Sequence, residues 1–399
     1  LRRRKVIISH SIRLASTETQ EAYFFRAAGT ARFTYNWALD AWKRQYEAGE
    51  RPSGFALKKQ FNAIRREQFP WTYDVHRDCT AQPFASLDKA FTAFFRKTAK
   101  YPKFKKRGQH DSFAVANDKF RLSGKQVKLP VLGWVKLRES LRFTGKIMGA
   151  TVVRKAHAWF LSVQVDVGDY RKVRAANGIV GVDLGVKTSA VLSTGDFVQG
   201  PKALHRAQKR LRRLSRRHSR KVKGSSNKRK TSQLLARLHF RVANTRSDFL
   251  HKLSTKLCRE NQTVVIEDLY VKGMVRTRKL AKSISDEGWG ELRRQLEYKS
   301  RIYGTNVIVA DRWFPSSKLC SFCGARKADL KLSDRTYSCE QCGAVIDRDW
   351  NAARNLEQLG TVSPEVTPAD IGALVSLTGN ETLVDEAGTI CGHLCSQKG

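Results

Sequence analysis

The first half of the chain changes its hydrophobic period twice. Residues 1–15 contain the run KVIISHSIRL, which predicts one strand. Residues 18–100 place apolar and aromatic side chains three and four positions apart, which predicts helices with a buried face. Residues 112–170 alternate or run through β-branched residues, as the strands of a sheet or small barrel do. We therefore expect a helical insertion within a β domain that begins at the N-terminus. The helical stripe is clearest at Phe84, Leu87, Phe91, Phe94 and Phe95.

The second half alternates strand and helix patterns. GIVGVDLG and TSAVLST, from residue 177 on, predict adjacent strands joined by a tight turn at Gly185-Val186-Lys187. A long helical region, about 202–260, precedes the apolar strand TVVIEDL. A helix near 287–303, the strand NVIVADRW and a closing helix WNAARNLEQL follow. This alternation predicts an α/β core. Residues 361–399, with five acidic residues and one lysine, are expected to form a weakly ordered tail.

The charge balance points to a nucleic-acid partner. The chain holds 75 Lys and Arg against 36 Asp and Glu, a formal net charge of +39. A field of that sign favours phosphate backbones, and the chain is long enough for two or three cores, unlike most small basic proteins. No apolar run reaches membrane-spanning length and no secretory signal opens the chain, so we expect no membrane and a cytoplasmic location.

A basic run at 205–230 has 13 Lys or Arg among the 25 positions from 206. It can be a solvated face, a disordered arm or a surface that follows phosphates. The overall charge favours the third interpretation, and Leu211 with Leu214 gives a minimal apolar stripe for a helix. The residues expected to contact nucleic acid here are Arg212, Arg213, Arg216 and Arg217.

Four cysteines have the spacing of a metal site. Cys320 and Cys323 form one CxxC unit, and Cys339 and Cys342 form a second unit after fifteen intervening residues. Two such knuckles supply four thiolates to one tetrahedral zinc ion, and a closed shell of this kind is structural. Paired CxxC units also suit a reducing cytosol better than a disulfide framework.

Three carboxylates are candidates for a second metal site. Asp183 and Glu267 each end an apolar run, and Asp349 directly precedes the last helix pattern. Singly, each could be a turn or helix-cap residue. Together they can converge and bind Mg²⁺ or Mn²⁺ ions that activate water and stabilise a leaving oxygen of a phosphodiester. Asp268 should point to the opposite face of its strand, whereas Asp347 could share the face of Asp349. The pattern predicts a metal-dependent nuclease of the RNase H type.

These motifs resemble the TnpB family, RNA-guided nucleases of bacterial insertion sequences related to the type V CRISPR effectors. The match covers about residues 1–358. The matching segments are RFTYNWAL, SLDKAFTAFFRK, GVDLGVKTSAV, VVIEDLYVKGM, SSKLCSFCG and CEQCGAVIDRDWNAARNL.

The resemblance implies a multidomain α/β protein with an RNase H-like (RuvC) core and an inserted four-cysteine zinc ribbon. It implies a β-barrel wedge domain at 1–15 and 112–172, interrupted by a helical recognition domain at 16–111. The RuvC-like domain would span 173–317 and 347–360, with the zinc ribbon at 318–346. Asp183, Glu267 and Asp349 would be the catalytic triad in the order Asp, Glu, Asp.

The expected activity is RNA-guided cleavage of double-stranded DNA beside a short flanking motif. The guide RNA would derive from the transposon end, and we expect a monomer. In the family, the helical insertion and the wedge domain read the flanking motif; Gln82 could pair with adenine there, or it could simply face solvent.

Three alternative functions are weighed against this one. A catalytically silent RNA-guided binder is disfavoured because all three carboxylates are present, and a DDE transposase or resolvase because its acids run Asp, Asp, Glu. A transposase accessory protein that merely binds DNA through a zinc ribbon leaves residues 177–310 unexplained.

Overall fold

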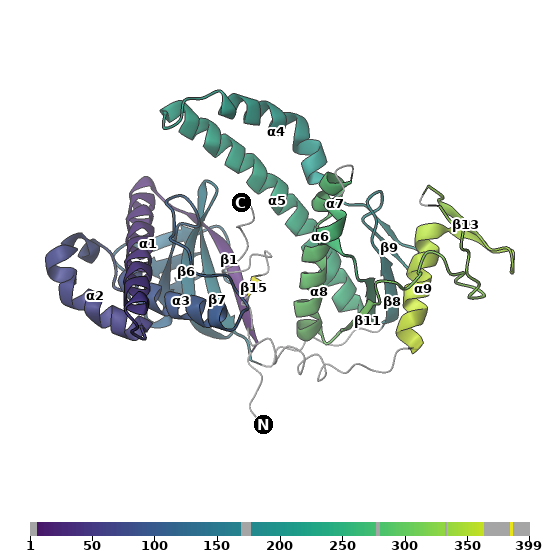
Figure 1. Cartoon of the computed structure of the whole chain (residues 1–399), viewed down its shortest axis with the longest axis horizontal. Helices are drawn as coiled ribbons and strands as arrows, with labels where there is room; N and C mark the ends of the chain where they lie inside the picture. The colour runs from purple at the N-terminus through teal and green to yellow at the C-terminus, as the bar shows by residue number, and fades with distance from the viewer. Residues whose placement is uncertain (1–5, 169–176, 277–279, 332, 363–383, 386–399) are drawn as a thin grey trace. The chain divides into compact units, whose positions relative to one another are not determined.

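The computed structural model describes residues 6–168, 177–276, 280–331, 333–362 and 384–385 (Figure 1). The chain forms two compact units, Leu1–Asp169 with Glu381–Gly399, and Tyr170–Asn380. Almost all of the predicted tail lies outside the described residues. Among the helices within the described ranges, none combines the length and apolarity needed to span a bilayer.

The first unit is built on antiparallel strands in the order β2-β6-β7-β1-β5-β4-β3. The N-terminal strand β1 pairs with both β7 and β5. The strands before and after the helical insertion therefore form one β domain, as predicted. A short strand, β15 (Val384–Asp385), also pairs with β1. The other strands are β1 (Ile7–Ala15), β2 (Ser112–Ala116), β3 (Arg121–Ser123), β4 (Gln126–Leu129), β5 (Gly133–Leu137), β6 (Lys146–Lys155) and β7 (Ala158–Asp166).

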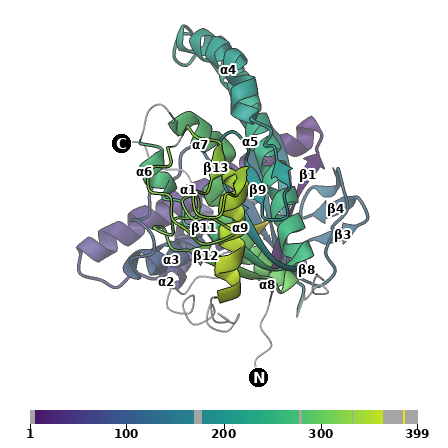
Figure 2. The ribbon, with the colours of Figure 1, turned by 90° about the vertical axis from the view of Figure 1, so that its right-hand side faces the viewer.

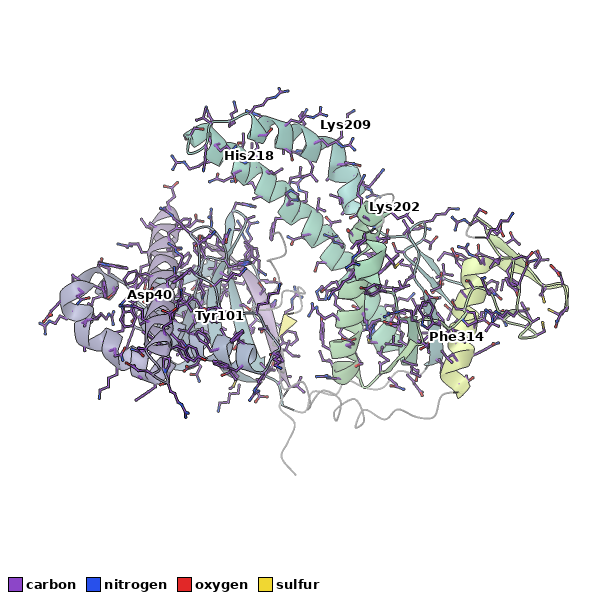
Figure 3. The ribbon with its side chains drawn as sticks, in the orientation of Figure 1. Asp40, Tyr101, Lys202, Lys209, His218 and Phe314 are labelled. Atoms are coloured by element: carbon purple, nitrogen blue, oxygen red, sulfur yellow. The ribbon has the colours of Figure 1, made fainter. Side chains whose placement is uncertain are left out.

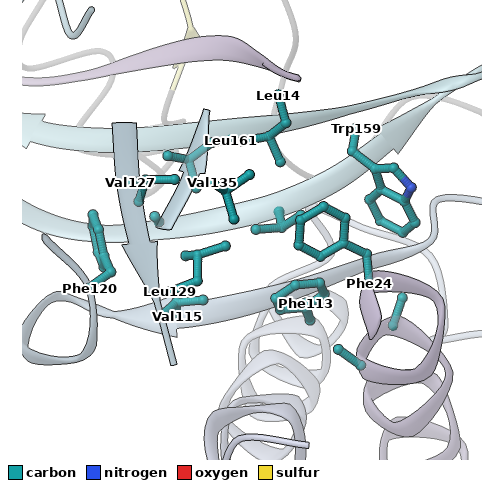
Figure 4. Packing of buried hydrophobic residues seen from close by; sticks show 14 of the residues in the cluster. Leu14, Phe24, Phe113, Val115, Phe120, Val127, Leu129, Val135, Trp159 and Leu161 are labelled. Carbon is teal, nitrogen blue, oxygen red and sulfur yellow. The ribbon is translucent and has the colours of Figure 1, made fainter. Parts of the chain in front are cut away.

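The predicted helical insertion is also present. It comprises α1 (Glu18–Glu47), α2 (Gly54–Gln68), a 3₁₀ turn at Pro70–Asp74 and α3 (Asp78–Phe95). A 3₁₀ turn at Asn117–Lys119 follows β2. Phe24 of α1 packs into the core of the sheet beside Phe113 and Trp159 (Figure 4).

The predicted aromatic stripe is confirmed for most of its members. Phe84, Leu87 and Phe91 are buried in a cluster with Trp42 and Phe61. Phe95 does not belong to the buried face: it is the last residue of α3 and its side chain is 58% exposed. The helix ends before a partner surface covers that position.

The second unit has a sheet in the order β10-β9-β8-β11-β12. β8 (Asn177–Asp183), β11 (Asn261–Glu267) and β12 (Asn306–Ala310) run parallel. β9 (Ala190–Leu192) runs antiparallel to β8, as the two adjacent strand patterns predict, and β10 (Phe197–Val198) pairs with β9. The helices are α4 (Ala203–Ser219), α5 (Ser226–Glu260), α6 (Val271–Met274), α7 (Ala281–Glu287), α8 (Trp289–Tyr303) and α9 (Arg348–Val362).

Strand alternation sorts this sheet into two faces. Val264 and Ile266 of β11 pack with α5 and α8 residues such as Leu257 and Leu296. Val265, between them, packs with Leu356 of α9 on the other face. Figure 2 shows α9 crossing in front of the strands. The unit is therefore a sheet between helical layers, and odd-numbered residues of β11 face α9.

The cysteine-bearing segment lies between β12 and α9. It contains the antiparallel hairpin of β13 (Thr336–Ser338) and β14 (Val345–Asp347), and an isolated bridge joins Leu319 to Arg326. Tyr337 and Ile346 form its small core with two of the cysteines, Cys320 and Cys339.

Candidate functional site

Two of the predicted carboxylates end neighbouring parallel strands. Asp183 is the last residue of β8 and Glu267 the last of β11, and the register pairs Val182 with Ile266 just before them. Because side chains alternate along a strand, Glu267 shares the face of Val265, which α9 covers. Asp183 likewise shares the face of Gly181, which contacts α9. Both carboxylates therefore belong to one face and one edge of the sheet.

Helix α9 reaches this edge because Gly181 has no side chain. A Cβ atom at that position would lie 2.0 Å from the carbonyl oxygen of Ala353 and 2.5 Å from the amide nitrogen of Glu357. A Cβ atom on Gly360 would similarly lie 2.7 Å from a methyl group of Val265. Backbone atoms cannot yield as a flexible side chain can, so glycine at 181 is needed for this close packing. The packing sets where the first turn of α9 lies.

The structure distinguishes Asp347 from Asp349. The Asp347 carboxylate accepts hydrogen bonds from the amides of Asp349 (2.9 Å) and Trp350 (3.1 Å), so Asp347 caps α9. Asp349 lies inside the first turn, and the alternative that it serves as the helix cap is wrong. Its carboxylate pairs instead with Arg348 at 2.9 Å, and Arg335 lies 4.0 Å away.

The three carboxylates interact electrostatically. Burial, followed by the charges of Glu267 and Asp349, raises the pKa of Asp183 well above its usual range. Burial and the charge of Asp349 also raise the pKa of Glu267, although a hydrogen bond from Ser316 Oγ at 2.6 Å opposes that rise. Negative charge is thus crowded at a half-buried sheet edge, where a cation would relieve the repulsion.

Asp268 illustrates how the strand separates neighbouring carboxylates. It accepts a hydrogen bond from Arg293 of α8 at 2.6 Å and also pairs with Arg312. Since α8 covers the face opposite to α9, the prediction that Asp268 points away from the carboxylate cluster is confirmed. These two guanidinium groups lower the pKa of Asp268, with the Arg312 hydrogen bond as the larger cause.

The four cysteines meet as their spacing predicts. Their sulfur atoms all lie within 4.8 Å of one another, and two pairs lie 3.6 Å and 3.5 Å apart. Zinc–sulfur bonds of about 2.3 Å in a tetrahedron give sulfur–sulfur edges of about 3.8 Å, so the arrangement fits a four-thiolate shell. Hydrogen bonds from the backbone of Cys342 are the main cause that lowers the pKa of the Cys339 thiol to about 6.

In both knuckles a glycine directly follows the second cysteine. The amide of Gly324 donates to the carbonyl of Cys320 at 2.9 Å, and that of Gly343 donates to the carbonyl of Cys339 at 3.0 Å. Their φ angles are 76° and 71°, in the left-handed region that favours glycine.

Polar residues of α9 join the cysteine cluster to the carboxylates, and the sequence analysis missed them. Asn351 accepts a hydrogen bond from the amide of Ser321 at 2.9 Å and donates to the carbonyl of Leu319. Asn355 donates to the carbonyls of Ser316 and Leu319. The spacing of Asn351 and Asn355, one helical turn apart, is the signal that could have shown them on one face.

The basic run forms a packed helical hairpin rather than an arm. Helix α4 runs beside α5 (Figure 1); Leu211 is buried, and His218 hydrogen-bonds Thr231 of α5 at 3.1 Å. Asp286 of α7 accepts from the amides of Leu204 (2.9 Å) and His205 (3.1 Å), and so caps the start of α4. The interpretation as a disordered arm is therefore wrong. Figure 3 shows the side chains along this helix. The predicted contacts Arg212, Arg213, Arg216 and Arg217 line a shallow hollow along it.

Gln82 lies in α3 and its side chain is half-buried. Nearby polar groups serve the fold: Asp78 accepts from the amide of Ala116 at 2.8 Å, and His76 contacts the carbonyl of Ala114 at 3.2 Å. Because Asp78 and His76 already form hydrogen bonds within the fold, Gln82 is the residue of this segment that we still predict to contact a base.

Models of known protein families match three segments of this chain. A family model described as "Probable transposase" (OrfB_IS605) matches residues 162–278, and a "Cas12f1-like, TNB domain" model matches residues 289–356. A helix-turn-helix domain model of the same transposase group matches residues 6–51, which form β1 and α1 here.

Two curated relatives cover most of this chain. A Streptomyces pristinaespiralis protein is 38% identical over 359 residues, which is 87% of this chain and 88% of that protein. InsQ of Escherichia coli K12 is 34% identical, over 86% of this chain and 89% of InsQ. Both are named "Putative RNA-guided DNA endonuclease".

A cryo-EM structure of a Cas12f1–sgRNA–target DNA complex contains a chain of similar fold. It covers 88% of this chain and 99% of that one, with a TM-score of 0.56 and 14% sequence identity. At this identity the likeness concerns the fold alone.

Proposed function

The chain belongs to the TnpB family, and from this membership we propose that it is an RNA-guided DNA endonuclease with a metal-dependent active site of the RuvC type. The observation that carries the proposal is the electrostatic interaction of Asp183, Glu267 and Asp349. The first two end neighbouring strands, the third lies in the first turn of α9, and burial and repulsion raise the pKa values of Asp183 and Glu267. Carboxylate oxygens suit Mg²⁺ or Mn²⁺.

The residues of the site have two kinds of proposed role, binding metal ions and orienting the carboxylates that bind them. Asp183, Glu267 and Asp349 would hold the ions. Bound ions would supply activated water and stabilise the leaving oxygen of the phosphodiester. Ser316 donates to Glu267 at 2.6 Å and fixes the direction of its carboxylate. Arg348, whose guanidinium lies 2.9 Å from the Asp349 carboxylate, would fix the direction of that carboxylate.

The remaining parts supply structure and recognition. Zinc on Cys320, Cys323, Cys339 and Cys342 would be structural, and its ribbon is tied to α9 through Asn351. The first unit would act as a barrel-like wedge domain with a helical recognition insertion, and the second as the RuvC core. A guide RNA from the transposon end and a double-stranded DNA target are the proposed partners, and a bacterial cytoplasm is the proposed location.

Sequencing the RNA that copurifies with the protein tests the guidance. Guide RNA complementary to a chosen target, combined with the protein and Mg²⁺, should then cut that DNA. EDTA or the Asp183→Ala substitution should stop cutting while leaving RNA-guided DNA binding nearly unchanged. Guided binding without any cutting by the unsubstituted protein would instead support the catalytically silent alternative.

The basic helix is proposed to contact the backbone of the RNA or of the guide–target heteroduplex. Replacing Arg212, Arg213, Arg216 and Arg217 together with Gln should weaken binding without regard to base sequence. It should also flatten the salt dependence, because fewer counterions are released. Substitution of Lys252 and Lys256, exposed on α5, is the matched control. An unchanged affinity and salt slope would remove α4 from the binding surface.

Gln82 is proposed to contribute to choice of the flanking motif. A library of flanking sequences cut by Gln82→Ala should show relaxed preference at one position, because a lost bidentate contact costs about 1–3 kcal/mol of discrimination. The substitution Gln60→Ala, at an exposed residue of α2, is the control. An unchanged preference profile would count against the role of Gln82.

A further inference from the structure

A tryptophan that the proposed chemistry does not use follows β12, the strand that pairs with β11. The side chain of Trp313 is 83% exposed. It follows β12, whose last residue Ala310 pairs with Glu267 in the parallel register. The segments after Ala310 and after Glu267 therefore leave the sheet at the same edge, next to each other.

The backbone around Trp313 is firmly held. The Trp313 amide donates to the carboxylate of Asp311 at 2.8 Å. Phe314, labelled in Figure 3, packs into the core under α9, and Ser316 donates to Glu267. The chain thus anchors residues on either side of Trp313 while leaving its indole in solvent. An exposed aromatic on a mobile loop would lack these restraints.

A second aromatic, Tyr270, lies on the adjoining segment after Glu267, and Arg312, next to Trp313 in the chain, contacts it. Tyr270 is 48% exposed, and the guanidinium of Arg312 lies 5.1 Å from the centre of its ring. Arg312 also pairs with Asp268, which Arg293 holds at 2.6 Å, and Arg293 in turn pairs with Glu297 at 3.0 Å. These two arginines and two carboxylates balance, so this surface offers flat π systems with little net charge.

We propose that Trp313, supported by Tyr270 and Arg312, is a stacking site for an unpaired base of the DNA strand that enters the carboxylate cluster. This inference rests on the proposed function. Aromatic side chains can stack on a base only where the strand is unpaired, and such stacking tolerates any base. The contact would position the strand through a base near the scissile phosphate. It differs from α4, which attracts the backbone by charge.

Cleavage of guided target DNA gives the first test. Trp313→Ala should reduce the cleavage rate at subsaturating DNA by roughly five- to hundred-fold, as expected for one stacked base. Trp313→Phe should restore most of the rate, because a phenyl ring still stacks. Trp134→Ala is the matched control, since Trp134 is 47% exposed but belongs to the first unit. The salt slope should remain that of the unsubstituted protein, because little net charge is involved.

Base stacking can be observed without cutting. In a complex inactivated by Asp183→Ala, 2-aminopurine is placed singly along the target strands near the cut. Its fluorescence should be quenched at one or two positions and recover with Trp313→Ala. A DNA single strand carrying 2-aminopurine, mixed with protein that has no guide RNA, provides a form of this measurement that does not depend on guided cleavage.

The outcomes separate the two proposals. Normal guided cutting and unchanged 2-aminopurine signals with Trp313→Ala would overturn the stacking site and leave the nuclease intact. Quenching that depends on Trp313 in a protein that never cuts would support the stacking site and refute the nuclease. A change in oligomeric state with Trp313→Ala, without any change in DNA signals, would assign the exposed ring to a protein contact and overturn the inference.

Discussion

The cysteine cluster and the carboxylate cluster belong to the same unit but are assembled over very different lengths of chain. The cysteines come from two knuckles, within the stretch from Cys320 to Cys342, and each knuckle is closed by its own backbone hydrogen bonds. The carboxylates come from β8, β11 and α9, which meet only when the whole unit folds.

Because of this difference, the two clusters should respond differently to substitutions made far from their own residues. A cysteine knuckle should fail only when a ligand or its turn is altered. The carboxylate cluster should fail also when the packing of α9 is altered far from any carboxylate. Asn351 joins the two, because it bonds the first knuckle from a position two residues beyond Asp349.

The largest effect is expected at Asp349. Asp349→Ala should lower Mg²⁺-dependent cleavage by at least roughly 100-fold, since even residues that only orient metal ligands typically contribute 10- to 100-fold. Asp347→Ala removes the helix cap and should cost about 0.5–2 kcal/mol of stability while retaining cutting. Cleavage assays and thermal melts of the pair measure both. Robust cutting by Asp349→Ala together with loss in Asp347→Ala would reverse the assignment.

Removing a zinc ligand should damage the ribbon as a whole. Cys339→Ser should abolish zinc binding and lower solubility and activity, because a structural zinc contributes directly to the free energy of folding. Metal analysis should find about one zinc per chain in the unsubstituted protein. Cys79→Ser, at a buried thiol of α3, should keep the zinc. Active protein free of zinc would contradict the structural role.

Gly181 tests whether the carboxylate cluster depends on remote packing. Gly181→Ala should destabilise the second unit by about 1–3 kcal/mol or more, because the added Cβ meets the backbone of α9. Cutting should fall through displacement of Asp349, while zinc content stays unchanged. Gly178→Ala on the same strand has open space around its Cβ and is the control. Equal behaviour of the two variants would show that α9 can shift without harm.

Ser316 should give the smallest of these effects. Ser316→Ala removes the hydrogen bond that lowers the pKa of Glu267, so that pKa should rise further. The carboxylate then ionises at higher pH, and the acid limb of the pH–rate profile should move to higher pH. The maximal rate should fall by roughly 10-fold. Ser300→Ala, at a half-buried serine of α8 that donates to the carbonyl of Glu297, is the control. An unmoved acid limb in Ser316→Ala would mean that the hydrogen bond does not tune Glu267.

Much of the framework could be predicted because it follows from local patterns. The change of period from helix to strand located the helical insertion within the β domain, and apolar runs placed Asp183 and Glu267 at strand ends. The same periodicity wrongly predicted that Phe95 is buried, because the spacing of apolar residues does not show where the packing against a helix ends. The charge of α4 was evident, but its cap, Asp286, comes from a helix distant in sequence.

The sequence by itself determined the cysteine site, since a CxxC spacing with a following glycine closes its turn through hydrogen bonds only a few residues long. It also determined that Asp268 turns away from Glu267, since neighbouring residues of a strand face opposite sides. Only the tertiary structure decided that Asp347 caps α9 while the charge of Asp349 raises the pKa values of both Asp183 and Glu267. That choice depends on how closely α9 packs on Gly181, a contact between residues far apart in the chain.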